Sequence, residues 1–250
     1  MYRNISRGIS EWREFGLFGD RELWENARMV FADVPVDEET VRDWVPLPLQ
    51  LAKPARASVF IADYPETSFG CVYREAALLL HVRLFGVIPA VYCPWMVVDD
   101  DRAMILGREL LGYPKKMAKF RFEEKNGKFL GTVRRKGVEV LRMEGSIGAE
   151  VDDPPPGIGR RTINARHLLG AAPGHLLAFR PRETVHSAND MNLKVTLSSS
   201  PEDPIGVATG EAENATIRTC DIGANFLLPP LRIWPVGPGF QAKLMRLRVH

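Results

Sequence analysis

Apolar residues recur with a short period along most of the chain, which predicts strands rather than helices. Almost continuous apolar runs cover residues 57–62, 76–85 and 87–98. A run that is apolar at nearly every position is typical of a strand covered on both faces, and we expect this of residues 76–85 in particular. Pro89 and Pro94 restrict the third run to a sheet edge or to a bulge.

Further strands are predicted downstream, joined by short turns. Asn126-Gly127 is a strong signal for a hairpin, and Lys136-Gly137 predicts a second turn in the meander over residues 115–148. More strand-like segments follow, at residues 162–169, 175–179, 192–198 and 223–234. Many strands with few helices favour an antiparallel barrel or sandwich. If such a sheet closes, a ligand can bind at its mouth.

Two short helical segments interrupt this pattern. Residues 35–45 begin with a proline that suits a first helical turn, and acidic residues follow it. The second segment is introduced by three aspartates at residues 99–101, which can cap a helix, and Gly112 and Pro114 mark its end.

All 250 residues are expected to form a single domain. Residues 1–34 carry several aromatic side chains without a clean period, which predicts an N-terminal arm that packs on the body or on a neighbouring subunit. The turn-rich segment 152–159 is interpreted as a surface loop, and residues 236–250 as a basic C-terminal tail. Trp12 and Trp24 can line a pocket or a subunit interface, and the sequence leaves both open.

Composition is that of an ordinary soluble globular protein, with 45% hydrophobic and 26% charged residues. A formal net charge of +2 creates no strong field, so we expect no nucleic-acid or membrane partner. No apolar run approaches the roughly 20 residues that span a bilayer, and the N-terminus lacks the apolar core of a signal peptide. Three widely spaced cysteines fit reduced thiols, so we expect a cytoplasmic protein.

The strongest chemical signal is the decapeptide at residues 107–116, Gly-Arg-Glu-Leu-Leu-Gly-Tyr-Pro-Lys-Lys. It places two adjacent lysines where the second helix gives way to a strand. A charged lysine is costly to bury, and a buried lysine that loses its proton becomes a nucleophile. Without the flanking residues, the pair would be interpreted as the solvated start of a basic edge strand.

This decapeptide resembles the signature of the acetoacetate decarboxylase family. Weaker similarities occur at residues 45–49 (Val-Pro-Leu-Pro-Leu), 73–75 (Tyr-Arg-Glu) and 226–229 (Phe-Leu-Leu-Pro). The resemblance implies a homo-oligomer, and a lysine that forms a Schiff base with a keto acid. It also implies the fold that we expect: α+β, mainly antiparallel β, with a closed or partly closed β-barrel core and a few short helices.

The resemblance implies roles for individual residues. It makes Lys115 the Schiff-base lysine and Lys116 an accessory, and it aligns Glu75 with an active-site glutamate. Strand alternation points the other way, because it places Lys116 on the face of Phe120 and Phe122. The predicted catalytic residues are therefore Lys115, Lys116 and Glu75, with Lys115 as the expected nucleophile. For Glu75 an ordinary salt bridge to Arg74 or another cation stays open.

The mechanism requires a neutral amine near pH 7, although the pKa of a free lysine is about 10.4. A neighbouring cation or an apolar cavity can lower that pKa. Consecutive strand residues point to opposite faces, so the two lysines should diverge if both lie in a strand. We therefore expect burial to be the larger cause.

Three residues are predicted to bind the substrate: Arg28, Tyr73 and Tyr113. The family places an arginine in the N-terminal arm for the substrate carboxylate. In this chain Ala27 occupies that slot, and Arg28 fits only after a shift of one residue. A second glutamate of the family has no counterpart, because residues 59–61 are Val-Phe-Ile.

These residues predict a carbon–carbon lyase that acts through a lysine Schiff base on a small keto acid. The altered positions motivate an alternative, an aldolase–dehydratase that condenses a 2-oxo acid such as pyruvate with an aldehyde. Glu75 or Tyr113 would then be the acid–base partner. A third reading is a non-catalytic barrel that binds small apolar ligands. We expect no metal or organic cofactor, because the five histidines lack metal-ligand spacing.

Overall fold

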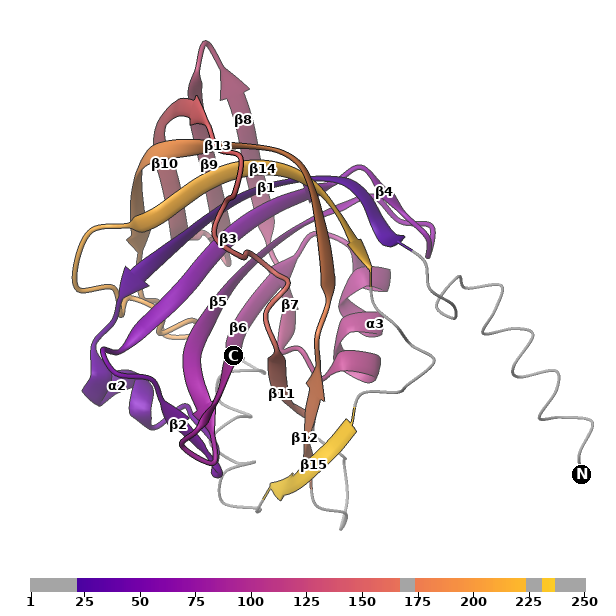
Figure 1. The fold of residues 1–250 in the computed structure, drawn as a ribbon, viewed down its shortest axis with the longest axis vertical. Coiled ribbons are helices and arrows are strands. Elements are labelled where there is room, and N and C mark those ends of the chain that lie inside the picture. Colours follow the sequence, from indigo (N-terminus) through magenta and orange to yellow (C-terminus); the bar gives the residue numbers. More distant parts are fainter. Residues whose placement is uncertain (1–21, 167–173, 224–230, 237–250) are drawn as a thin grey trace, which may run out of the picture.

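The computed structural model of the protein describes residues 22–166, 174–223 and 231–236. In this part of the chain fifteen strands form one sheet, accompanied by two helices (Figure 1). The strands are β1 (Glu22–Pro35), β2 (Leu49–Leu51), β3 (Arg56–Tyr64), β4 (Glu66–Thr67), β5 (Tyr73–Leu84), β6 (Ile88–Val98), β7 (Lys115–Met117), β8 (Lys119–Lys125), β9 (Lys128–Arg135), β10 (Val138–Glu150), β11 (Thr162–Arg166), β12 (Gly174–Phe179), β13 (Arg182–Leu197), β14 (Glu213–Gly223) and β15 (Leu231–Val236). The helices are α2 (Glu38–Arg42) and α3 (Asp101–Leu111).

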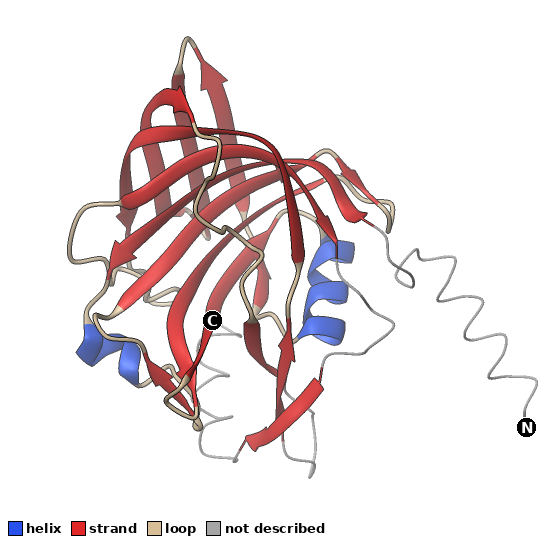
Figure 2. Cartoon of the chain, viewed as in Figure 1, coloured by secondary structure: helices blue, strands red, loops and turns tan. Residues whose placement is uncertain are grey.

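Hydrogen-bonded neighbours follow the order β15-β12-β11-β6-β5-β3-β1-β14-β13-β10-β9-β8, with β2, β4 and β7 paired to β5, β1 and β6. Nearly all these pairs are antiparallel; β6 pairs in parallel with β7 and with β11. Figure 2 shows the long strands curving together with little helix beside them. The prediction of a mainly antiparallel β fold with a few short helices is confirmed.

Hydrogen bonds do not close this sheet in the described residues. The path ends at β15 on one side and at β8 on the other. Five of the seven β8 residues are exposed and most are charged, as is usual for an edge strand that avoids further pairing. The expectation of a closed barrel is therefore not met by the strand pairing.

The central strands are covered on both faces. In β3, Val59 and Ile61 belong to one apolar cluster, whereas Phe60 and Ala62 belong to the other. β5 has the same double covering, as its continuous apolar sequence predicted. Each fully buried aliphatic side chain contributes about 1.5–3 kcal/mol to the free energy of unfolding, so this covering stabilises the middle of the sheet.

Residues 22–34 of the expected N-terminal arm are strand β1, which lies between β3 and β14. The arm prediction is wrong for these residues, because burial on both faces removes the alternation that would have indicated a strand: residues 29–34 are all buried. β1 also contains a bulge between Trp24 and Ala27, where Asn26 has a φ of +53° and its backbone N–H donates to Asp221. Residues 1–21 of the arm lie outside the described part.

Both helices are capped by aspartates, and this was predicted for the second of them, which begins after residues 99–101. Asp37 accepts from the backbone N–H of Thr40 at the start of α2, and Asp100 accepts from that of Ala103 at the start of α3. α3 ends at Gly112 in the left-handed conformation. α2 is shorter than the predicted segment 35–45.

The two predicted turns are confirmed at Asn126-Gly127 and Lys136-Gly137, all four residues having positive φ. Several strands were missed, among them β1, β14 and the short β2 and β4. We predicted none over residues 205–222, yet β14 lies there, and buried polar residues such as Thr216 and Arg218 hide its pattern. The similarity at residues 226–229 and most of the predicted tail at 236–250 fall outside the described residues. Within the described residues, no helix has the length and apolar character needed to cross a membrane.

Candidate active site

The joint between α3 and β7 decides where the two lysines point. Gly112 ends the helix with a φ of +67°, and Lys115 opens β7 directly after Pro114. β7 pairs in parallel with the end of β6, where Lys115 lies opposite Met96. Successive strand residues point to opposite faces, and the side chains of Lys115 and Lys116 have different partners on different sides of the sheet. The predicted divergence of the two lysines is confirmed.

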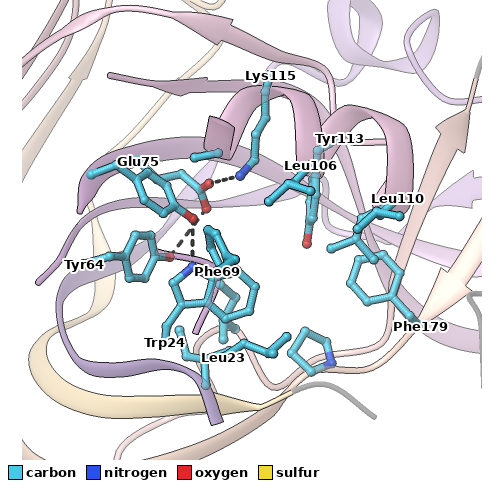
Figure 3. Close-up of a pocket in the computed structure, with 17 residues that line it drawn as sticks. Leu23, Trp24, Tyr64, Phe69, Glu75, Leu106, Leu110, Tyr113, Lys115 and Phe179 are labelled. Atoms are coloured by element: carbon cyan, nitrogen blue, oxygen red, sulfur yellow. Dashed lines mark hydrogen bonds and ion pairs between the residues drawn. The ribbon is translucent and has the colours of Figure 1, made fainter. Parts of the chain in front are cut away.

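Lys115 meets Glu75 inside a pocket (Figure 3). Its Nζ atom lies 2.6 Å from Oε2 of Glu75, and the two side chains are only 5% and 6% exposed. The alternative partner of Glu75, Arg74, instead forms an ion pair of 2.9 Å with Asp63. A buried charge without a partner is strongly destabilising, so the amine and the carboxylate hold each other in place.

Three tyrosines surround this ion pair. Nζ of Lys115 lies 5.3 Å from the ring centroid of Tyr73 and 5.9 Å from that of Tyr113. The hydroxyl of Tyr64 donates to Oε1 of Glu75 at 3.5 Å. Burial raises the pKa of all three tyrosines well above the ordinary value of 10.0. Their hydroxyl groups therefore remain protonated, and able to donate, at neutral pH.

Gly107 of α3 provides the space for the lysine side chain. A Cβ atom at this position would lie 2.5 Å from Cε, 2.6 Å from Cδ and 2.9 Å from Nζ of Lys115. These separations are shorter than van der Waals contact, so any larger residue must displace the lysine or the helix. Arg108 strengthens the same joint, because its Nη1 donates to the carbonyl oxygen of Lys115 at 3.4 Å.

The rest of the pocket wall is apolar. The centres of water-sized molecules can occupy about 50 Å³ of the cavity. Leu23 and Trp24 of β1 form one side, and Leu106 and Leu110 of α3 lie across from them with Phe179 at the end of β12 (Figure 3). Trp24, which the sequence left between a pocket and an interface, lines this pocket. Its indole nitrogen donates to the hydroxyl of Tyr73 at 2.8 Å.

Lys116 is buried on the other face, against the carboxylate of Asp203. Nε of Arg135 donates to the same carboxylate at 2.6 Å, and the indole nitrogen of Trp95 donates to it at 2.8 Å. Burial lowers the pKa of Lys116, although the hydrogen bond to Asp203 opposes this shift. Lys116 does not line the pocket that contains Lys115. The two lysines therefore lie in separate surroundings, with separate carboxylate partners.

The structure does not bring Arg28 into the pocket. Ala27 and Met29 face the apolar cluster next to the pocket, so Arg28 between them faces the opposite side. There its guanidinium forms two hydrogen bonds of 2.8 Å with the carboxylate of Glu124 and one of 3.1 Å with Thr219. The prediction that Arg28 meets a substrate carboxylate in this pocket is not supported by this placement.

The structure unites four of the predicted site residues and adds others. Lys115, Glu75, Tyr73 and Tyr113 all line the pocket. Sequence reasoning missed several further side chains: Tyr64, Leu106, Leu110, Phe179 and, on the opposite face, Asp203. The i, i+4 spacing of the two leucines in the predicted helix was a usable signal. Nothing near Asp203 in the sequence indicated a contact with Lys116.

Fold and site together define a protein that can enclose a small molecule around a buried lysine–carboxylate pair. The family model of acetoacetate decarboxylase (ADC) matches residues 9–221. The chain therefore belongs to the acetoacetate decarboxylase family.

Individual relatives match less of the sequence. An acetoacetate decarboxylase of Ralstonia nicotianae is 34% identical over 97 residues, which are 39% of this chain and 38% of that protein. One of Burkholderia vietnamiensis is 34% identical over 116 residues, or 46% and 44% of the two chains. The matched regions thus span less than half the length of these curated relatives.

Solved structures share the fold over most of the chain. A structure of acetoacetate decarboxylase superimposes with a TM-score of 0.77 at 20% identity, covering 88% of this chain and 92% of that one. The acetoacetate decarboxylase of Legionella pneumophila superimposes with a TM-score of 0.75 at 13% identity, covering 87% of this chain and 88% of that one. The enduracididine biosynthesis enzyme MppR, complexed with the condensation product of pyruvate and imidazole 4-carboxaldehyde, gives 0.69 at 17% identity, covering 84% and 89%.

Replacing Gly107 with alanine should disable Lys115 without unfolding the protein. The new methyl group would overlap the lysine stem, while alanine itself favours a helix by about 1 kcal/mol over glycine. We expect at least a tenfold loss in the rate at which Lys115 reacts with a carbonyl probe, measured by reductive trapping and mass spectrometry. Gly159→Ala is the control, because a Cβ there meets nothing closer than 3.4 Å. An unchanged rate in Gly107→Ala would contradict the close packing described above.

Replacing Asp203 with asparagine should destabilise the fold by about 3–5 kcal/mol at pH 7, because Lys116 and Arg135 lose their buried counter-charge. Burial opposes ionisation of Asp203, but hydrogen bonds from Lys116 and Arg135 outweigh it and hold its pKa below the ordinary 3.8. This stabilisation is therefore present above pH 3.8 and is lost on further acidification.

Urea unfolding of wild type and Asp203→Asn at pH 7 and at pH 3 measures this contribution. The difference in unfolding free energy should shrink at the lower pH. Asp152→Asn, at an exposed position, is the matched control and should change stability by less than about 0.5 kcal/mol. A difference between wild type and Asp203→Asn that stays constant with pH would show that the carboxylate is not the stabilising group.

Proposed function

We propose that this protein is a carbon–carbon lyase that forms a Schiff base between Lys115 and the ketone of a small keto acid. The observation that carries the proposal is the amine of Lys115, held 2.6 Å from Glu75 at the polar end of an apolar cavity. Membership of the acetoacetate decarboxylase family supports the same chemistry.

We propose that Glu75 accepts a proton from Lys115 and later donates it to the departing oxygen. A lysine attacks a carbonyl only as the neutral amine. Transfer of one proton from Nζ of Lys115 to Oε2 of Glu75, over 2.6 Å, converts the ion pair into an amine and a carboxylic acid. The acid can then protonate the oxygen that leaves as water, so one carboxyl group serves in turn as base and acid.

The reaction with a 3-keto acid would proceed through covalent steps on Lys115. The amine adds to the ketone carbon, and loss of water gives a protonated imine. The bond between C2 and the carboxylate then breaks, and its electron pair moves toward the imine nitrogen to give an enamine and CO₂. Protonation of the enamine carbon and hydrolysis of the imine release the ketone and regenerate Lys115.

The apolar wall supports the bond-breaking step in particular. A carboxylate is poorly stabilised among leucine and phenylalanine side chains, whereas the neutral CO₂ that leaves is not penalised there. The positive charge of the imine offsets the negative charge of the carboxylate before cleavage, and both vanish together. A cavity with few polar groups therefore favours the products over the bound acid.

An aldolase–dehydratase activity is the second candidate. Its support is the set of protonated tyrosine hydroxyls beside the ion pair, above all Tyr113, which can assist the loss of water from an aldol adduct. MppR, which shares the fold, is described with pyruvate and with a condensation product of pyruvate. In this alternative the enamine from a 2-oxo acid adds to an aldehyde in place of losing CO₂.

Further features belong to the same proposal. We propose one acetoacetate-decarboxylase-like domain over residues 1–250, whose curved sheet acts as a partly closed barrel around the cavity. Lys116 would position β7 through Asp203 and would take no part in the covalent steps. A cytoplasmic location and a homo-oligomer remain predictions from sequence and family.

Reductive trapping tests the Schiff base directly. Purified protein is incubated with acetoacetate and borohydride, digested, and mapped by mass spectrometry. We expect one adduct, on Lys115, and none in Lys115→Arg, which keeps a cation opposite Glu75. An adduct on Lys116 would overturn the assignment of the nucleophile. Absence of any adduct with acetoacetate, with longer 3-oxo acids and with pyruvate would favour a non-catalytic ligand-binding protein.

Product analysis separates the two reactions. The protein is incubated with acetoacetate, and in a second sample with pyruvate plus an aromatic aldehyde. We expect CO₂ release from the first above the enzyme-free rate, and at least a tenfold reduction in Glu75→Gln, because the amide cannot accept the lysine proton. A condensation product from the second sample, with no excess CO₂ from the first, would replace the decarboxylase proposal by the aldolase.

A further inference from the structure

The mouth of the pocket is lined by apolar side chains that are only partly buried. These are Trp24, Leu106, Leu110, Ile158 and Phe179. All five contact the core that surrounds the Lys115–Glu75 pair, yet each keeps part of its surface toward the cavity or the solvent. Partly exposed aromatic and leucine side chains around one opening are typical of a surface that a ligand covers.

The charged groups in the described wall of the cavity are buried. Among its described lining residues, Lys115 and Glu75 are the only charged ones, and they neutralise each other. Arg28 points to the opposite face of β1 and is held by Glu124. The described wall thus offers no second cation for a carboxylate at the far end of a substrate.

The helix α3 gives the outer part of the cavity its form. Leu106 and Leu110 are one helical turn apart and present adjacent side chains to the cavity, across from Trp24 and Leu23 (Figure 3). Because Gly107, which lies between them in the sequence, has no side chain, α3 can pack closely against the side chain of Lys115. An apolar slot therefore leads outward from the reactive amine between α3 and β1.

We propose that the physiological substrate carries an apolar chain or ring longer than the methyl group of acetoacetate, seated in this slot with its ketone at Lys115. This inference rests on the proposed Schiff-base function and adds the class of substrate: an alkyl or aryl 3-keto acid. The tail takes no part in the covalent steps. It contributes binding energy by leaving water, which is worth about a fourfold gain in affinity for each methylene group buried.

A series of 3-oxo acids tests the proposal: 3-oxobutanoate, 3-oxohexanoate and 3-oxooctanoate. The measured quantity is kcat/KM for CO₂ release after subtraction of the spontaneous rate. We expect kcat/KM to increase about tenfold for each pair of added methylene groups. This is less than full burial of both groups would give, because the slot is partly open to solvent. The dicarboxylate 3-oxohexanedioate should react at least tenfold more slowly than 3-oxohexanoate, because its second carboxylate would enter an apolar wall.

Paired variants on α3 locate the effect. Leu110→Gln should lower the ratio of kcat/KM between 3-oxooctanoate and 3-oxobutanoate at least fivefold. Ile105→Gln is the matched control, since Ile105 is 54% exposed on the same helix and does not line the pocket. It should leave both this ratio and the activity unchanged.

The outcomes distinguish the substrate class from the function on which it rests. Trapping of Lys115 by 3-oxobutanoate, with kcat/KM that does not rise with chain length or that is highest for the dicarboxylate, would overturn the apolar-substrate inference alone. Failure of every 3-oxo acid to give an adduct on Lys115 would overturn the proposed function and the substrate class with it. A ratio lowered equally by Ile105→Gln and Leu110→Gln would reject the slot on α3.

Discussion

The buried ion pair between Lys115 and Glu75 constrains the structure around it. The two opposite charges lie 2.6 Å apart and are almost fully buried. Separating them would leave each charge buried without a partner, so the strands that carry them must be held firmly in place. Glu75 is fixed by the antiparallel ladder between β5 and β6, and Lys115 by the parallel pairing of β7 with the same β6. One strand thus positions both partners. α3, which joins β6 to β7, closes over the lysine stem at Gly107 and completes the enclosure.

Two adjacent lysines have different environments because the strand sends them to different faces. On one face the partner is a single carboxylate among tyrosine rings and leucines, which leaves the amine next to open space. On the other, Asp203 receives Lys116, Arg135 and Trp95 together. The second arrangement, in which Asp203 receives three donors, fits the anchoring role proposed for Lys116, whereas the pocket beside Lys115 fits its proposed role as nucleophile. Their sequence neighbourhood is identical, so the distinction arises from tertiary structure.

Local signals in the sequence predicted the parts of the fold that depend on local physics. Asp100 and Gly112 delimit α3, and the two Gly-containing turns delimit the β8–β10 meander. Lys115, Glu75, Tyr73 and Tyr113 were found through their motifs. Strands β1 and β14 were missed because burial on both faces, or buried polar residues, removes their period. The sequence could not show that Asp203 contacts Lys116 or that Phe179 lines the pocket of Lys115. Both placements depend on strand pairings between segments that are far apart in the sequence.

The bulge near the start of β1 determines which side chains of this strand face the apolar cluster next to the pocket. β1 contains one residue more than β14 between Trp24 and Ala27. In a strand, the face on which each side chain lies depends only on whether its position is odd or even. The extra residue therefore sets the phase of everything that follows: Ala27 and Met29 inward, Arg28 outward. Insertion or loss of a single amino acid there would exchange the two rows and turn Arg28 toward the apolar cluster next to the pocket.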